Sequence, residues 1–180
     1  LATVLGDDSG SRMFWELVDP GFAETASMGA CEYQGTGILM THLSCAPEDT
    51  AENLARLRDI LAEAEAGGGT EAEVAQAKSK IRSYIVLQSE RPVNRLFAVG
   101  GNWIARRQYR TVRETIESYE RVTCDDVTAI AQRLADLGHE ILWWEMPHRR
   151  RPEPGEPCVE LPGGFQAPAF LVAIVRAVVA

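Results

Sequence analysis

The 180-residue sequence lacks the long apolar runs and the paired histidines or cysteines of membrane spans and metal sites. It has no stretch of 18 apolar residues, because its longest candidate, residues 169–180, is short and interrupted by Arg176. Its three histidines, His42, His139 and His148, do not have the three- or four-residue spacing of a helical zinc site. Its four cysteines show no C-x-x-C spacing, which argues against a zinc ribbon or a thioredoxin-like redox motif. We therefore expect no metal site and no membrane span in this chain.

The charge balance also excludes a class of partners. The chain has 26 acidic and 18 basic residues, a formal net charge of −8, which disfavours a protein that binds nucleic acid by neutralising phosphates. Two basic clusters, residues 106–110 and 148–151, are read as solvated faces. With 46% hydrophobic and 24% charged residues, the composition is that of a folded globular domain.

Motifs for nucleophilic or phosphate chemistry are missing as well. No G-x-S-x-G pattern occurs, and the three glycines at residues 67–69 are not followed by the Lys-Ser/Thr of a phosphate-binding loop. Cys124 stands at a predicted helix start and is read as a residue of the capping region. Trp143 and Trp144 point to opposite faces of a predicted strand. Together with Trp103 they leave open a small binding module that stacks a ligand on tryptophan.

The first half of the chain predicts a helix end, a short helix and a hairpin. Residues 1–5 read as the end of a helix, and Met13, Phe14 and Leu17 share the inner face of a second, short one. Residues 22–33 and 38–46 read as antiparallel strands, with Cys31 facing Met40 across the hairpin.

The second half is mainly helical. We expect one helix from about residue 50 to residue 66, and a second from the capping box at residues 70–73 to the Arg-Pro at residues 91–92. Two further helices are expected to begin at residues 111–114 and at residues 123–126. A strand is expected at residues 140–146. Two segments repeat apolar residues at helical spacing, namely Val74, Ala77, Ile81, Tyr84 and Ile85, and the stripe of Val93, Leu96, Phe97 and Ile104. The last helix has a predicted inner face of Val127, Ile130, Ala131 and Leu134.

This order predicts an α+β domain, an antiparallel sheet with helices packed on one face, over residues 1–146. Residues 147–180 hold six of the nine prolines and are expected to be a largely irregular tail with an apolar end. For that apolar end a docked strand, a helix and a reading-frame artefact all stay open.

Four stretches are similar, in the same order, to patterns of one peptidase family. Residues 10–17 resemble G-x-S-R-L-F-x-E-V, and residues 46–53 resemble S-P-E-N-A-x-E. Residues 69–78 resemble G-I-T-E-E-E-L-x-x-A-K, and residues 116–127 resemble I-x-x-V-T-x-x-D-V. From residue 1 to about residue 146 the chain thus resembles the insulinase and mitochondrial processing peptidase family, the pitrilysin-like inverzincins.

The resemblance implies a specific kind of domain within that family. Members pair homologous α+β domains around a chamber, and an H-x-x-E-H motif in the N-terminal half holds zinc whose bound water attacks the peptide. This chain has no such motif and resembles the other, C-terminal type, beginning inside its first helix with the preceding strand missing. The resemblance therefore implies no cofactor in this chain, zinc in a partner domain, and as partner a homologous N-terminal-type domain in the same chain or a separate subunit.

The resemblance assigns no catalytic residue here. The family places an Arg and a Tyr seven residues apart after S-R-L-F, where they contact substrate and help to stabilise the reacting carbonyl. Val18 and Thr25 occupy those positions, and neither supplies a guanidinium or a phenol. We expect a non-catalytic domain that closes a peptide-binding chamber, or alternatively a structural or assembly subunit without peptidase activity. The motif residues Ser11, Arg12, Phe14 and Glu16 are expected to be structural.

Overall fold

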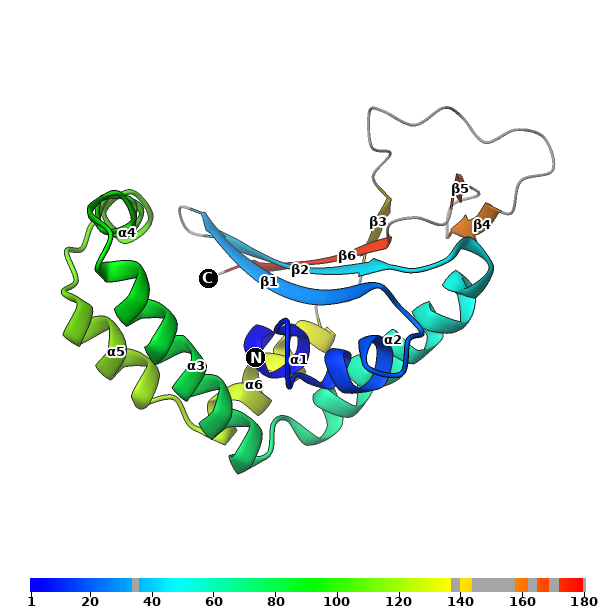
Figure 1. Ribbon diagram of the computed structural model, residues 1–180, viewed down its shortest axis with the longest axis horizontal. Coiled ribbons are helices and arrows are strands. Elements are labelled where there is room, and N and C mark those ends of the chain that lie inside the picture. The colour runs from blue at the N-terminus through cyan, green and yellow to red at the C-terminus, as the bar shows by residue number, and fades with distance from the viewer. Residues whose placement is uncertain (34–35, 137–139, 144–157, 162–164, 169–171, 180) are drawn as a thin grey trace.

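The computed structural model describes residues 1–33, 36–136, 140–143, 158–161, 165–168 and 172–179. It confirms the α+β fold, with an antiparallel sheet in the strand order β1-β2-β6-β3 and helices packed on one of its faces (Figure 1). His139, Trp144 and His148 lie outside the described residues.

The hairpin formed by β1 (Thr25–Tyr33) and β2 (Thr36–Ser44) is tighter than the sequence predicted. Tyr33 pairs with Thr36, so that Cys31 lies opposite Ile38, whereas Met40 pairs with Gly29. The predicted register was therefore wrong by two residues. Because side chains alternate with a period of two, this slip leaves every side chain on its predicted face.

The chain after residue 147 contains strands, which differs from the irregular tail that the sequence suggested. The strands β4 (Cys158–Leu161) and β5 (Phe165–Pro168) pair with each other, while β6 (Val172–Val179) lies between β2 and β3 (Glu140–Trp143). Valine-rich β6 has the composition of a strand, and it pairs the otherwise free edge of β2. A domain boundary at residue 146 stays a prediction.

Three helices cover one face of the sheet (Figure 1). They are α1 (Ala2–Gly6), α2 (Thr50–Gly67), which follows the 3-10 turn η2 (Pro47–Asp49), and α6 (Cys124–Asp136). At Gly6 the chain of α1 comes so close to β1 that an added Cβ would lie 2.3 Å from the Met28 backbone nitrogen. Apolar side chains from these layers form the core: Val4, Leu5, Met13, Leu17, Ala26, Met28, Leu39, Leu43, Leu54, Leu57, Ile60, Leu61, Ala64, Val127, Ala131 and Leu134.

The three remaining helices extend from this core as an arm (Figure 1). They are α3 (Glu71–Ser89), α4 (Pro92–Arg106) and α5 (Val112–Glu120), and α3 and α5 both start with the predicted capping boxes, at Thr70 and Thr111. Within the described chain, no helix is long and apolar enough to cross a membrane.

Several of the apolar residues at helical spacing are exposed. In α6 the predicted inner face is buried at Val127, Ala131 and Leu134 but exposed at Ile130, which corrects that prediction. In α3, Val74 and Ala77 are buried, whereas Tyr84 is exposed. In α4 the whole apolar stripe is exposed: Val93, Leu96, Phe97 and Ile104. Periodicity identified the apolar face of α4 correctly but could not show whether this chain covers it.

Candidate functional site

The motif around Ser11 begins a short helix whose last turns form the π-helix η1 (Phe14–Val18). The buried Ser11 hydroxyl donates to the Asp7 carbonyl oxygen at 2.7 Å and accepts from the Phe14 backbone N–H at 3.2 Å. This pair of bonds supplies a partner for a backbone amide that a helix start leaves without one. Met13 and Leu17 then reach the core from the same helix.

Arg12 joins this helix to the connection between α2 and α3. Its guanidinium donates from Nε to Glu73 Oε1 at 2.7 Å and from Nη2 to Glu73 Oε2 at 2.9 Å, a bidentate ion pair. The same Nη2 donates to the Gly68 carbonyl oxygen at 2.8 Å. Two motif stretches that lie 61 residues apart in sequence therefore meet at one side chain.

Glu73 serves two structures at once. It is the third residue of α3 and accepts from the Thr70 backbone N–H and hydroxyl, both at 2.8 Å, which completes the capping box. The hydrogen-bonded Arg12 guanidinium, with help from the Thr70 donors, lowers the pKa of Glu73 to about 2. The arginine of this motif is thus fully engaged within the domain. Sequence reasoning missed Glu73 as its partner, and the only available signal was that both stretches match one family.

The other motif residues lie at the surface of the same helix. Phe14 packs edge-on against Trp15, with ring centroids 5.0 Å apart. Partial burial, together with the nearby Glu63 carboxylate, raises the pKa of Glu16.

The two positions that the resemblance aligns with the family's Arg and Tyr lie in different surroundings. Val18 ends η1 and packs, partly buried, against the core. Thr25 is exposed at the first residue of β1, opposite Ser44. Neither position presents a charged group or a phenol to a substrate.

The residues able to bind metal or act as nucleophiles are dispersed. Among the described residues, no three His, Cys, Asp or Glu side chains lie close enough to hold a metal ion. Cys31 is exposed, Cys45 is buried with its sulfur 3.6 Å from the Thr50 hydroxyl, and Cys124 is half-buried; all three are free thiols.

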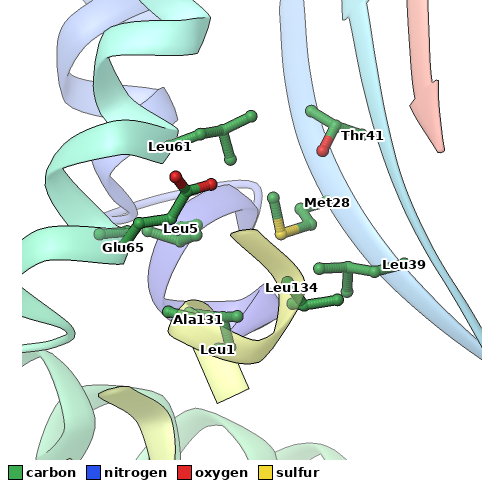
Figure 2. Close-up of a pocket in the computed structure, with 10 residues that line it drawn as sticks. Leu1, Leu5, Met28, Leu39, Thr41, Leu61, Glu65, Ala131 and Leu134 are labelled. Atoms are coloured by element: carbon green, nitrogen blue, oxygen red, sulfur yellow. The ribbon is translucent and has the colours of Figure 1, made fainter. Parts of the chain in front are cut away.

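The interior gap between the helices and the sheet is too small for a ligand. It measures about 10 Å³, close to the space of one water molecule, and its lining is almost wholly apolar (Figure 2). Leu5, Leu61 and Leu134 approach it from the helices, and Met28 and Leu39 approach it from the sheet. This region is packed core and not a binding site.

The comparisons with known proteins agree with this picture. The family described as the peptidase M16 inactive domain matches residues 1–81. An uncharacterized zinc protease of Mycobacterium bovis and another of Mycobacterium tuberculosis strain H37Rv are each 30% identical over 135 residues, which is 74% of this chain and 31% of the relative. One from Mycobacterium leprae is 28% identical over 74% of this chain and 30% of its own length. This chain thus spans about a third of the length of the curated relatives that it matches. The matched family and these relatives together mean that the chain carries an insulinase-family (M16) domain of the inactive, C-terminal type.

Proposed function

We propose that this domain forms one wall of a peptide-binding chamber and closes it against a homologous, zinc-bearing N-terminal-type domain. That partner lies in the same polypeptide or in a separate subunit. In that partner domain, zinc and a glutamate would activate the water that hydrolyses the peptide, while this domain would contribute the shape of the chamber wall. Two findings support a catalytic partner domain and a non-catalytic domain in this chain: the matched family is described as inactive, and the relatives are named zinc proteases.

The observation that carries the proposal is the sheet face turned away from α1, α2 and α6 (Figure 1). On the helix side, Ala26 and Met28 of β1 are buried in the core. Their neighbours Thr25, Gly29 and Cys31 alternate to the other face and are exposed. We call this surface the open face; in β2 it continues through Ile38, Met40, His42 and Ser44.

The open face has properties suited to an extended peptide. Its β1 side chains are small, so the strand surface is accessible, and Met40 offers an adaptable apolar contact. The resemblance aligns Thr25 of this face with the family's Tyr, which contacts substrate. A wall built this way binds by shape and apolar contact, without the charge stabilisation that an Arg and a Tyr would add.

The second candidate is a structural or assembly subunit of the same fold. Val18 favours it, because the position that the resemblance aligns with the family's Arg is packed against the core. In that case the open face would form a stable interface with another protein subunit and would not bind a peptide substrate transiently.

Alkylation of Cys31 separates the two candidates, because this native thiol is exposed on the open face. In the whole protein that contains this domain, we expect a tightly bound, uncleavable peptide to slow alkylation of Cys31. The control is Cys31→Ser/Arg58→Cys, which carries its accessible thiol on the exposed outer surface of α2 and is expected to react at an unchanged rate. A Cys31 that reacts equally with and without peptide, in a protein that cleaves no peptide, would instead support the assembly subunit.

A further inference from the structure

The helix α4 is fully formed and yet buries none of its residues. Its apolar side chains recur at the spacing of one helix face and are 53–73% exposed. We call this face the α4 ridge; it consists of Val93, Leu96, Phe97, Gly100, Trp103 and Ile104.

The opposite side of α4 faces α3 and α5. Five of its residues line a pocket of about 160 Å³ between the three helices, namely Asn94, Arg95, Ala98, Val99 and Asn102, and the Asn94 amide donates to Gln88 Oε1. At its other end, Arg106 forms a bidentate ion pair with Glu32 at the hairpin tip, with both contacts at 2.7 Å. These contacts orient the helix with its ridge outward. A helix of 15 residues is only marginally stable without packing on its apolar face, which is a physical reason to expect a covering partner.

Gly100 adds an independent sign of close contact. It lies in the middle of the ridge, where glycine disfavours the helix relative to alanine. A Cβ added there would meet nothing within 4 Å, so no contact with the described residues explains the missing side chain. A glycine on an apolar helix face allows a partner's backbone to approach closely, which lipid does not require.

The charge around the ridge defines the chemistry of that partner. Residues 91–113 contain six arginines and no acidic residue, in a chain whose net charge is −8. Arg106 is paired with Glu32 and two others line the inner pocket, so that the exposed Arg107 is the charge beside the ridge. Two such surfaces would repel each other, which disfavours a symmetric pair of this chain through the ridge. The surface complements an apolar groove bordered by carboxylates.

We propose that the α4 ridge is the docking surface for the zinc-bearing domain, which receives it in an apolar groove edged with acidic side chains. This inference rests on the proposed function, because it names the surface through which the two halves meet. The relatives are about three times as long as the segment that matches this chain, which in those proteins leaves enough length for such a domain.

The test measures association of this chain with the separately produced zinc-bearing half, and does not depend on peptidase activity. We expect Leu96→Ser to weaken the association about tenfold or more, since buried apolar anchors carry much of an interface's affinity. Ile130→Ser is the matched control, because it removes an equally large, exposed aliphatic side chain from α6. Arg107→Glu, at the exposed C-cap of α4 beside the ridge, is expected to weaken binding more at low salt than at high salt, whereas Arg58→Glu on α2 leaves it unchanged.

The glycines provide a second test that a damaged fold cannot imitate. Gly100→Ala and Gly101→Ala both favour the helix, and neither added Cβ meets an atom within 4 Å. We expect only Gly100→Ala to weaken the association, because Gly101 lies about 100° further around the helix, off the ridge.

The outcomes separate this inference from the proposed function. If the two halves associate but Leu96→Ser and Gly100→Ala bind like the unmodified chain, the ridge is not the docking surface and the proposed function stands. If the halves do not associate at all, both fail. Ridge-dependent binding to phosphatidylserine vesicles, or ridge-dependent self-association of this chain, without any effect on the second half, would also overturn the inference.

Discussion

Replacing Glu73 by glutamine tests whether the Arg12–Glu73 contact holds the two motif stretches together. The change removes the charge but keeps a side chain that can still complete the capping box at Thr70. Any loss of stability therefore reports on the bidentate pair with Arg12, and not on the start of α3. We expect the free energy of unfolding to fall by about 1–2 kcal/mol at pH 7.

The magnitude follows from the pKa of Glu73, which is lowered from 4.5 to about 2. A shift of that size corresponds to an upper limit of about 3.4 kcal/mol. A quarter of the Glu73 side chain and a sixth of the Arg12 side chain remain exposed, so solvent screening reduces the stabilisation below that limit.

The pH dependence has a defined sign. Because the folded-state pKa is the lower one, the stabilisation is complete above the unfolded-state pKa of 4.5 and is lost as pH falls towards 2. In urea unfolding, the difference in free energy of unfolding between the unmodified chain and Glu73→Gln should decrease by about half or more from pH 7 to pH 3.

The matched control for Glu73→Gln is Glu52→Gln, which breaks the exposed pair of Glu52 with Arg56 at 2.6 Å. It should lower the free energy of unfolding by only about 0.3–0.5 kcal/mol at pH 7. A Glu73→Gln effect no larger than that, or one that does not change between pH 7 and pH 3, would refute the reasoning.

Three further substitutions test the packing, each by the free energy of unfolding in urea. Gly6→Ala forces a Cβ into the backbone of β1 and should lower the free energy of unfolding by more than about 3 kcal/mol. Its control is Gly29→Ala on the open face, which has free space around it and should change that free energy by less than about 1 kcal/mol. Equal effects of the two substitutions would show that α1 does not lie so close to β1. Asn53→Ala removes the 2.6 Å bond from a buried amide to the Phe22 carbonyl oxygen and should destabilise by about 1–3 kcal/mol; no change would mean that this bond does not hold α2 to the start of β1. Leu57→Ala should destabilise by about 2–5 kcal/mol because that side chain is fully buried, and a loss below about 1 kcal/mol would contradict its place in the core.

The features that sequence predicted well depend on neighbouring residues. Each capping box is contained within four residues, and the boxes at Thr70 and Thr111 form as expected. The α+β class also followed from the local order of strands and helices. The hairpin register was wrong by two because it depends on where the turn is centred: a turn centred on Gly35 and Thr36 was assumed, whereas Tyr33 pairs with Thr36.

The features that sequence could not predict depend on residues far apart or on a partner. The contact of Arg12 with Glu73 spans 61 residues, and no local pattern identifies such a pair. The stripe in α4 has the periodicity of a buried face, yet Leu96 and Phe97 are exposed, because periodicity does not identify the covering surface. Pairing of β6 with β2 likewise depends on an edge that forms only once the hairpin has folded.

The most direct measurement of the central claim is zinc content combined with peptide hydrolysis, for this chain alone and for the whole protein that contains it. The account predicts no zinc and no metal-dependent hydrolysis with this chain alone, and about one zinc with peptide hydrolysis in the whole protein. Zinc-dependent hydrolysis by this chain alone would contradict its description as a non-catalytic domain. A whole protein without zinc or hydrolysis would contradict the proposed chamber and leave the assembly subunit as the function.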